Sequence, residues 1–136
     1  MLWEDCFLEG GIAQAAVVLV LSESLTVGVG VLPAPLRNVV ITAMEIATLE
    51  AMFPGRLRVG IGHGVQNWMR QAGAAAASPL TLMREYVTAL GDLLAGRSVT
   101  VDDRYVRLAE VRLDWAPQQR VPDRRNRTQA RILMQA

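Results

Sequence analysis

The chain has 136 residues, of which 51% are hydrophobic and 20% charged, so we expect a globular protein of at most one ordinary domain. The net charge of +1 gives no general case for nucleic-acid binding, and all 14 basic residues are arginine, which excludes a P-loop or Schiff-base lysine. The single cysteine, Cys6, excludes an intrachain disulfide and a cysteine-based zinc site.

The beginning of the chain lacks the marks of a secretory signal or a membrane span. The first five residues are acidic where a signal is basic, and the apolar segment 12–21 is too short to cross a bilayer. We therefore expect a soluble, cytoplasmic protein with no membrane partner.

Strands and helices alternate in the first half of the chain. Leu2–Phe7 suits the end of a buried strand, and 12–21 predicts a buried helix. Leu25–Leu32 is a nearly continuous apolar run, which is typical of a parallel strand covered on both faces. A helix over Asn38–Met52 and a strand over Leu57–Ile61 follow. The apolar face expected for this helix consists of Val40, Met44, Ala47 and Ala51.

The second half begins with a long helix that has Ser78 as N-cap and ends at Gly96. Its expected apolar face consists of Leu80, Met83, Val87, Leu90 and Leu94. Segment 99–108 predicts a hairpin with a polar turn, and 111–115 a further extended piece. The alternation predicts a parallel α/β fold, either a (β/α) barrel or a doubly wound sheet.

The strand Leu57–Ile61 ends in glycines at 60, 62 and 64, and a helix start follows at Val65. Glycine permits close approach of a ligand to the backbone, and a helix N-terminus favours an anionic or electron-rich ligand. The glycine spacing does not match the dinucleotide fingerprint, because the third glycine comes one residue too early. The acid expected about twenty residues later would be Glu85, which lies inside a predicted helix.

Three segments, Leu25–Asn38, Ala43–Leu49 and Phe53–Gly64, resemble the bacterial-luciferase-like monooxygenase family. The likeness is greatest to actinobacterial members that use a flavin or the deazaflavin coenzyme F-420. The early Trp3-x-Asp5-x-Phe7 and the later hairpin fit the same family, so the resemblance covers about residues 2–117.

The resemblance implies an incomplete TIM (β/α)8 barrel fragment. Leu2–Phe7, Leu25–Leu32 and Leu57–Ile61 would be strands two to four, each with its helix, and the hairpin a short insertion. We expect a partial barrel domain over 1–119 and a basic, disordered or aberrant tail over 120–136. A frameshift near Pro122 is our hypothesis for that tail.

The resemblance also assigns candidate site residues. In relatives a cis peptide at the position of Gly30-Val31 forms a bulge behind the cofactor ring; the alternative is an ordinary trans strand end. His63, Gly64 and Val65 match the stretch whose backbone contacts the cofactor. His63 is either a weak candidate for a catalytic proton donor or a loop histidine bonded to backbone. The expected cofactor-binding set is Asp5, Gly30, Val31, Pro33, His63, Gly64 and Val65, with no metal site.

Two further residues have open roles. Cys6 stands where some relatives carry a histidine near the redox centre, so that histidine's role is not transferred, and we expect a buried thiol. Arg37 either faces a phosphate or is a solvated residue near a helix start.

The function implied is hydride transfer between reduced FMN or coenzyme F-420 and a small organic substrate. The alternative is a truncated, non-catalytic remnant that is unstable or self-associates, as a homo-oligomer or an aggregate, through open strand edges. A third hypothesis is a small anion- or nucleotide-binding module.

Overall fold

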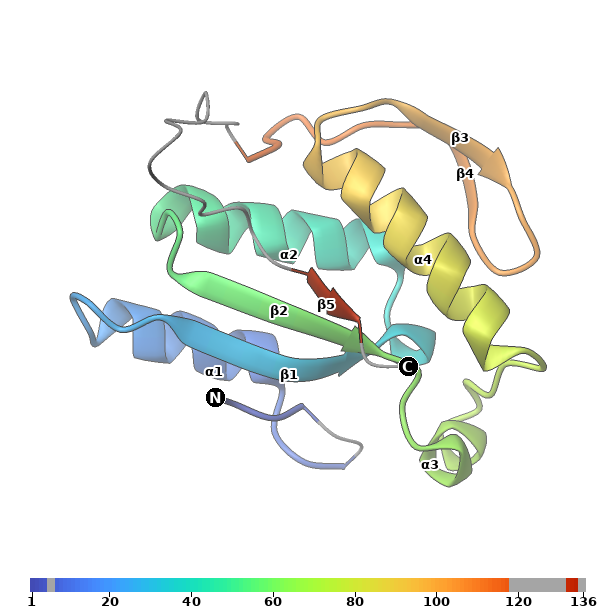
Figure 1. Cartoon of the computed structure of the whole chain (residues 1–136), viewed down its shortest axis with the longest axis horizontal. Coiled ribbons are helices and arrows are strands. Elements are labelled where there is room, and N and C mark those ends of the chain that lie inside the picture. Colours follow the sequence, from blue (N-terminus) through green and yellow to red (C-terminus); the bar gives the residue numbers. More distant parts are fainter. Residues whose placement is uncertain (5–6, 118–131, 135–136) are drawn as a thin grey trace.

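The computed structural model describes residues 1–4, 7–117 and 132–134 (Figure 1). Four α-helices, a short 3-10 turn and five strands alternate along these residues. Their bounds are α1 Gly11–Val20, β1 Val27–Pro33, η1 Ala34–Leu36, α2 Val39–Met52, β2 Leu57–Gly62, α3 Gln66–Gln71, α4 Pro79–Leu94, β3 Val99–Asp102, β4 Arg107–Val111 and β5 Ile132–Met134.

The central sheet is parallel and has the order β1, β2, β5. On the other side of β1, Leu2 forms a single parallel bridge with Val29: the Leu2 N–H donates to the Gly28 carbonyl at 2.7 Å, and the Gly30 N–H donates to the Leu2 carbonyl at 2.9 Å. The prediction of a parallel α/β fold is confirmed.

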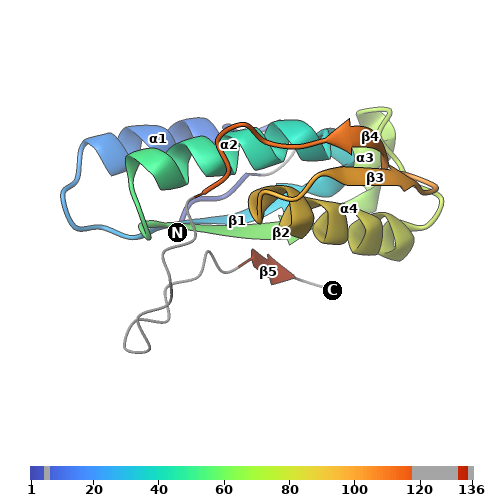
Figure 2. The same ribbon diagram turned by 90° about the horizontal axis from the view of Figure 1, so that it is seen from above.

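The helices α1 and α2 lie on the same side of β1 and β2 (Figure 2). A Cβ added to Gly11 would come 2.6 Å from Val29 Cγ1, so the start of α1 lies directly against β1. Alternate residues of a strand point to opposite faces, and on the face away from Val29 the positions are mostly glycine. These glycines are Gly28, Gly30, Gly60 and Gly62. The two strands therefore leave one face with little side-chain cover.

The predicted apolar face of α2 is partly wrong, because Met44 is 50% exposed and Ala51 is also exposed. This helix packs against both β2 and α4, so its buried arc is wide and includes a polar residue. Thr42 Oγ1 lies 2.6 Å from the Tyr86 hydroxyl in the buried contact between α2 and α4. Burial raises the pKa of Tyr86, and the hydrogen bond between Tyr86 and Thr42 opposes this shift.

The predicted face of α4 is also partly wrong, since Leu80 is 69% exposed while Glu85 and Tyr86 are buried. The Glu85 carboxylate accepts the backbone N–H groups of Tyr105 at 2.8 Å and Val106 at 3.3 Å. A buried acid with such partners escapes a search for apolar periodicity. The helix does begin after Ser78, but the Ser78 side chain makes no capping bond.

The predicted hairpin is confirmed as the antiparallel pair β3–β4. The Tyr105 hydroxyl accepts the Ser78 N–H at 2.7 Å, which fixes the hairpin to the start of α4. The separate extended piece predicted over 111–115 is wrong, because Val111 ends β4 and a turn follows at 114–115.

The short strand β5 pairs in parallel with β2, with Val59 opposite Ile132 and Ile61 opposite Met134. The sequence did not predict a strand here. Most of the basic tail, residues 118–131, lies outside the described residues, so the expectation for that segment stays a prediction. Within the described ranges, no helix is long and apolar enough to span a membrane.

Candidate functional site

The carboxyl ends of β1 and β2 lie side by side, with Pro33 opposite Gly62. The register of the pair shifts between Val29 and Leu32, and the peptide bond between Gly30 and Val31 inside this irregular stretch is cis. Of the two alternatives left open by the sequence, the structure has the cis bond.

Val31 explains two of the three glycines at the end of β2. A Cβ added to Gly60 would come 2.9 Å from Val31 Cγ1, and one added to Gly62 would come 2.7 Å from Val31 Cγ2. These separations are too short for real Cβ atoms, so both glycines make room for the Val31 side chain. The sequence allowed packing of strand on helix as an explanation, whereas the contact is with a side chain of the neighbouring strand.

Gly64 is required for a different reason. Its φ of +68° lies in the left-handed region, and a Cβ there would also come 2.8 Å from Met69 Cε. The positive φ turns the chain from β2 into α3, and Met69 of that helix is fully buried beneath the turn.

His63 is half-buried and forms a hydrogen bond with its neighbour's backbone, with Nδ1 2.8 Å from the Gly64 carbonyl oxygen. Since a carbonyl only accepts, Nδ1 carries the proton, and Nε2 of the neutral ring is an acceptor. Gln66 Nε2 donates to the carbonyls of His63 and Gly64, both at 3.3 Å. The geometry fits the loop histidine bonded to backbone, and a donor role for Nε2 would need the imidazolium form.

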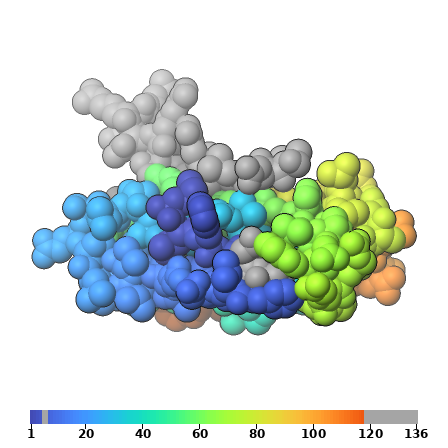
Figure 3. Space-filling model, turned by 90° about the horizontal axis from the view of Figure 1, so that it is seen from below, coloured from blue at the N-terminus to red at the C-terminus, as the bar shows by residue number. Residues whose placement is uncertain are grey.

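These strand exits enclose an open pocket of about 400 Å³. Its lining comprises Trp3, Glu4, Leu8, Gly30, Val31, Pro33, Gly62, His63, Gly64 and Val65. Six of the seven residues predicted from the sequence therefore lie around one pocket. The seventh, Asp5, and its neighbour Cys6 lie outside the described residues. Figure 3 shows the N-terminal residues in dark blue and the residues around α3 in green on one face of the molecule.

The pocket is mainly apolar, and Glu4 and His63 are its two titratable side chains among the described residues. In the part of the chain that the structure describes, no Arg or Lys side chain lines it. Apolar walls with exposed backbone groups suit a flat, neutral ring better than a phosphate. Among the described residues, no group of three or more His, Cys, Asp or Glu side chains is arranged to hold a metal ion.

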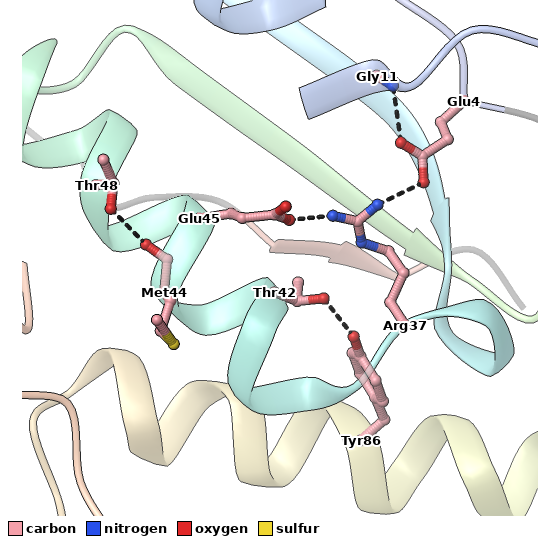
Figure 4. A network of polar contacts seen from close by, with 8 residues as sticks. All are labelled: Glu4, Gly11, Arg37, Thr42, Met44, Glu45, Thr48 and Tyr86. Atoms are coloured by element: carbon pink, nitrogen blue, oxygen red, sulfur yellow. Dashed lines mark hydrogen bonds and ion pairs between the residues drawn. The ribbon is translucent and has the colours of Figure 1, made fainter. Parts of the chain in front are cut away.

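Arg37 has neither of the roles considered from the sequence, because it lies between two carboxylates (Figure 4). Its Nη1 donates to Glu4 Oε1 at 3.1 Å, and its Nη2 donates to Glu45 Oε2. The other oxygen of Glu4 accepts the Gly11 N–H at 2.7 Å. Burial alone would lower the pKa of Arg37, but Glu4 and Glu45 raise it above its ordinary value.

Sequence reasoning missed Glu4, Trp3 and Leu8 as lining residues. Glu4 and Arg37 are 33 residues apart, and no local pattern links them. Glu4 does adjoin the predicted Asp5, so its place at a strand exit was the available signal.

The chain is similar to several known proteins. The family model described as luciferase-like monooxygenase matches residues 6–124. The 5,10-methylenetetrahydromethanopterin reductase of Methanolobus tindarius is 32% identical over 92 residues, which is 68% of this chain and 28% of that protein.

Two solved structures share the fold. The coenzyme F-420 dependent tetrahydromethanopterin reductase of Methanopyrus kandleri matches with a TM-score of 0.72 and 22% identity, over 83% of this chain and 37% of that one. An F-420-dependent secondary alcohol dehydrogenase, in complex with an F-420-acetone adduct, matches with a TM-score of 0.74 and 24% identity, over 88% and 41%.

The chain thus spans between 28% and 41% of the length of these relatives. At identities below 25%, the likeness to the two structures shows the fold alone. The family model covers most of the chain, including β1, β2 and every residue that lines the pocket except Trp3 and Glu4. The chain belongs to the luciferase-like monooxygenase family.

Proposed function

We propose that the pocket between the ends of β1 and β2 holds the ring system of coenzyme F-420. The chain would thereby take part in hydride transfer between this deazaflavin and a small organic substrate. One observation carries the proposal: backbone of Gly30–Pro33 and Gly62–Val65 converges on a single apolar pocket whose wall includes Val31. The relatives' names support a deazaflavin over FMN, because two of them are called F-420-dependent.

The sheet supports a barrel origin for this site. Leu2, β1, β2 and β5 follow one another in the sheet as they do in the chain, and all pair in parallel. Successive strands of a (β/α)8 barrel have this order, and its ligand sites lie at the carboxyl ends of the strands. We propose that these segments are four neighbouring barrel strands.

Each part of the pocket would have a separate task toward the coenzyme. Val31 would support one face of the ring, and the half-buried His63 would present Nε2 as a hydrogen-bond acceptor. Bound coenzyme would supply or accept the hydride.

A non-catalytic, self-associating chain is the second candidate, and the short strands beside β1 and β2 favour it. Leu2 makes one bridge on one side, and β5 has three residues on the other. Sheet edges that are covered so briefly can pair with another chain.

Fluorescence titration of the purified, size-checked chain with coenzyme F-420 and with FMN tests the proposal. We expect saturable binding of F-420 and weaker binding of FMN. Gly30→Ala adds a methyl group to a pocket-lining residue, 3.3 Å from Met1 Sδ, and should weaken binding about tenfold. Gly28→Ala is the matched control: it lies on the same face of β1, its nearest neighbours are 4.0 Å away, and it does not line the pocket.

A folded, monodisperse chain that binds neither ring would contradict the proposed function. Equal loss of affinity in the two glycine variants would contradict the proposed place of binding. An aggregated chain that binds nothing would favour the self-associating alternative.

A further inference from the structure

We propose that Glu4 is a positioning residue of the pocket, fixed from outside by Arg37 and Glu45. This inference rests on the proposed function and deepens it. The three charged side chains form a continuous chain from the pocket wall to α2 (Figure 4). From the sequence, only Arg37 was considered for a contact with a ligand, and Glu4 and Glu45 were not considered.

Glu4 lines the pocket, but both of its carboxylate oxygens are bound to other parts of the protein. One accepts the N–H of Gly11 at the start of α1, and the other accepts Arg37 Nη1. The side chain is only 12% exposed. Each carboxylate oxygen of Glu4 thus accepts one bond from the protein, and these two bonds fix the N-terminal wall to which Trp3 also belongs.

Arg37 connects this wall to the opposite one. Pro33 lines the pocket and immediately precedes η1, and the Arg37 N–H closes that turn by donating to the Ala34 carbonyl at 3.2 Å. Its guanidinium then reaches back to Glu4. The ion pair therefore joins the Pro33 wall to the Glu4 wall, in addition to the backbone bonds that Leu2 makes with Gly28 and Gly30.

Glu45 completes the arrangement from α2. The Arg37 side chain is 18% exposed and its Nε is buried without a partner in the described part of the chain, so Glu4 and Glu45 supply its polar contacts there. Replacing Glu4 or Glu45 by glutamine removes one of the two ion pairs of Arg37 and leaves its guanidinium held by the other carboxylate alone. We expect the guanidinium to move when either acid is neutralised, and Glu4 to move with it.

The test uses the full chain with Glu4→Gln, Glu45→Gln and Arg37→Lys. Glu50→Gln is the matched control, because Glu50 on α2 also accepts a backbone N–H, that of Gly55 at 3.0 Å, and lies outside the pocket. Two readouts are needed: the Kd for coenzyme F-420, and the anisotropy decay of Trp3 fluorescence without ligand. The second is measured with Trp68 and Trp115 replaced by Phe.

Glu4→Gln should weaken F-420 binding about tenfold and increase the fast local motion of Trp3. Glu45→Gln should have a smaller effect of the same kind, about threefold in Kd. Arg37→Lys should fall between them, because lysine keeps the charge but not the forked geometry. Glu50→Gln should change neither readout.

A purely stabilising network would lower the thermal midpoint of Glu4→Gln and leave Kd and Trp3 motion as in the Glu50→Gln control, and that result overturns the inference. If the wild-type chain binds no F-420, the proposed function fails. The Trp3 measurement then decides the positioning claim alone: greater motion in Glu4→Gln supports it, and unchanged motion overturns it.

Discussion

The two ends of the β1–β2 pair are built in opposite ways. At the amino end, Arg56 ties the loop before β1 to the loop before β2: Nε donates to the Leu25 carbonyl at 2.9 Å, and Nη2 donates to the Ser22 carbonyl at 2.8 Å and to its hydroxyl at 2.7 Å. At the carboxyl end, Gly60, Gly62 and Gly64 remove side chains so that Val31 and the turn into α3 fit.

We infer from this difference that the amino end of the strand pair serves stability and the carboxyl end serves binding. A charged side chain that satisfies loop carbonyls closes the amino end, while missing side chains keep the carboxyl end open. In parallel α/β proteins ligands occupy the carboxyl ends, and the opposite end serves stability. Substitutions at the two ends should therefore have different signatures in binding and in unfolding.

The largest effect is expected for Gly62→Ala. Its Cβ would come 2.7 Å from Val31 Cγ2, so the Val31 side chain, which lines the pocket, must shift. Overpacking of this kind lowers the free energy of unfolding by about 1–3 kcal/mol, and F-420 binding should fall below detection. Urea unfolding and fluorescence titration measure the two changes. Adding Val31→Ala should restore the stability. A double variant as unstable as Gly62→Ala alone would show that the methyl group at position 62 does not clash with Val31.

Arg56→Ala should give the opposite signature at the amino end. Losing three partly exposed hydrogen bonds should lower the free energy of unfolding by about 1–2 kcal/mol. The Kd for F-420 should not change, because Arg56 does not line the pocket. Arg70→Ala, whose bond to Asn67 is exposed, is the control and should change stability by less than about 0.5 kcal/mol. A change in Kd for Arg56→Ala would argue against the claim that the amino end of the strand pair serves stability and not binding.

Tyr86→Phe tests a contact that belongs to neither end. Losing the buried hydrogen bond to Thr42 should cost about 1 kcal/mol at neutral pH and leave Kd unchanged. Because burial raises the pKa of Tyr86, the folded state holds this proton more tightly than the unfolded state. Wild-type stability should therefore fall as pH rises above about 10, the ordinary tyrosine pKa. Urea unfolding measured around that pH should show a smaller fall in the free energy of unfolding for Tyr86→Phe than for the wild type. An equal fall in both proteins would contradict a raised pKa of Tyr86.

The smallest effect is expected for His63→Ala. If the carboxyl end binds mainly through backbone and apolar contacts, removing the imidazole should weaken F-420 binding only about threefold. The folded state should retain its thermal midpoint within about 2 °C, because the bond to Gly64 is local. Titration and thermal unfolding measure both values. A loss of affinity as large as that of Gly62→Ala would show that the side chain, not the backbone, holds the ligand.

The sequence was sufficient where the signal was local. The apolar run ending in Gly60 and Gly62 predicted β2, a pocket lies at its exit as expected, and Ser78 marked the start of α4. The helix faces were less predictable, because α2 contacts both β2 and α4 and because Glu85 is buried through bonds to a distant hairpin. The spacing of apolar residues along the chain shows neither that α2 contacts both β2 and α4 nor that Glu85 binds the hairpin.

Contacts between distant residues account for the rest. Val31 sits over glycines that are about thirty positions later in the chain, and nothing in one strand shows which side chain the other presents. The ion pair of Glu4 with Arg37 likewise joins side chains that are 33 residues apart in the chain. The glycines were visible in the sequence, but the side chain they accommodate was not.

The central claim is that the carboxyl ends of β1 and β2 bind the ligand and the amino ends do not. Amide chemical-shift mapping of the full, isotopically labelled chain during titration with coenzyme F-420 tests it most directly. The account predicts saturating shifts for Gly30, Val31 and residues 62–65, while Arg56 and Leu57 stay unchanged. Shifts concentrated at Arg56 and Leu57, or none at all in a folded chain, would contradict it.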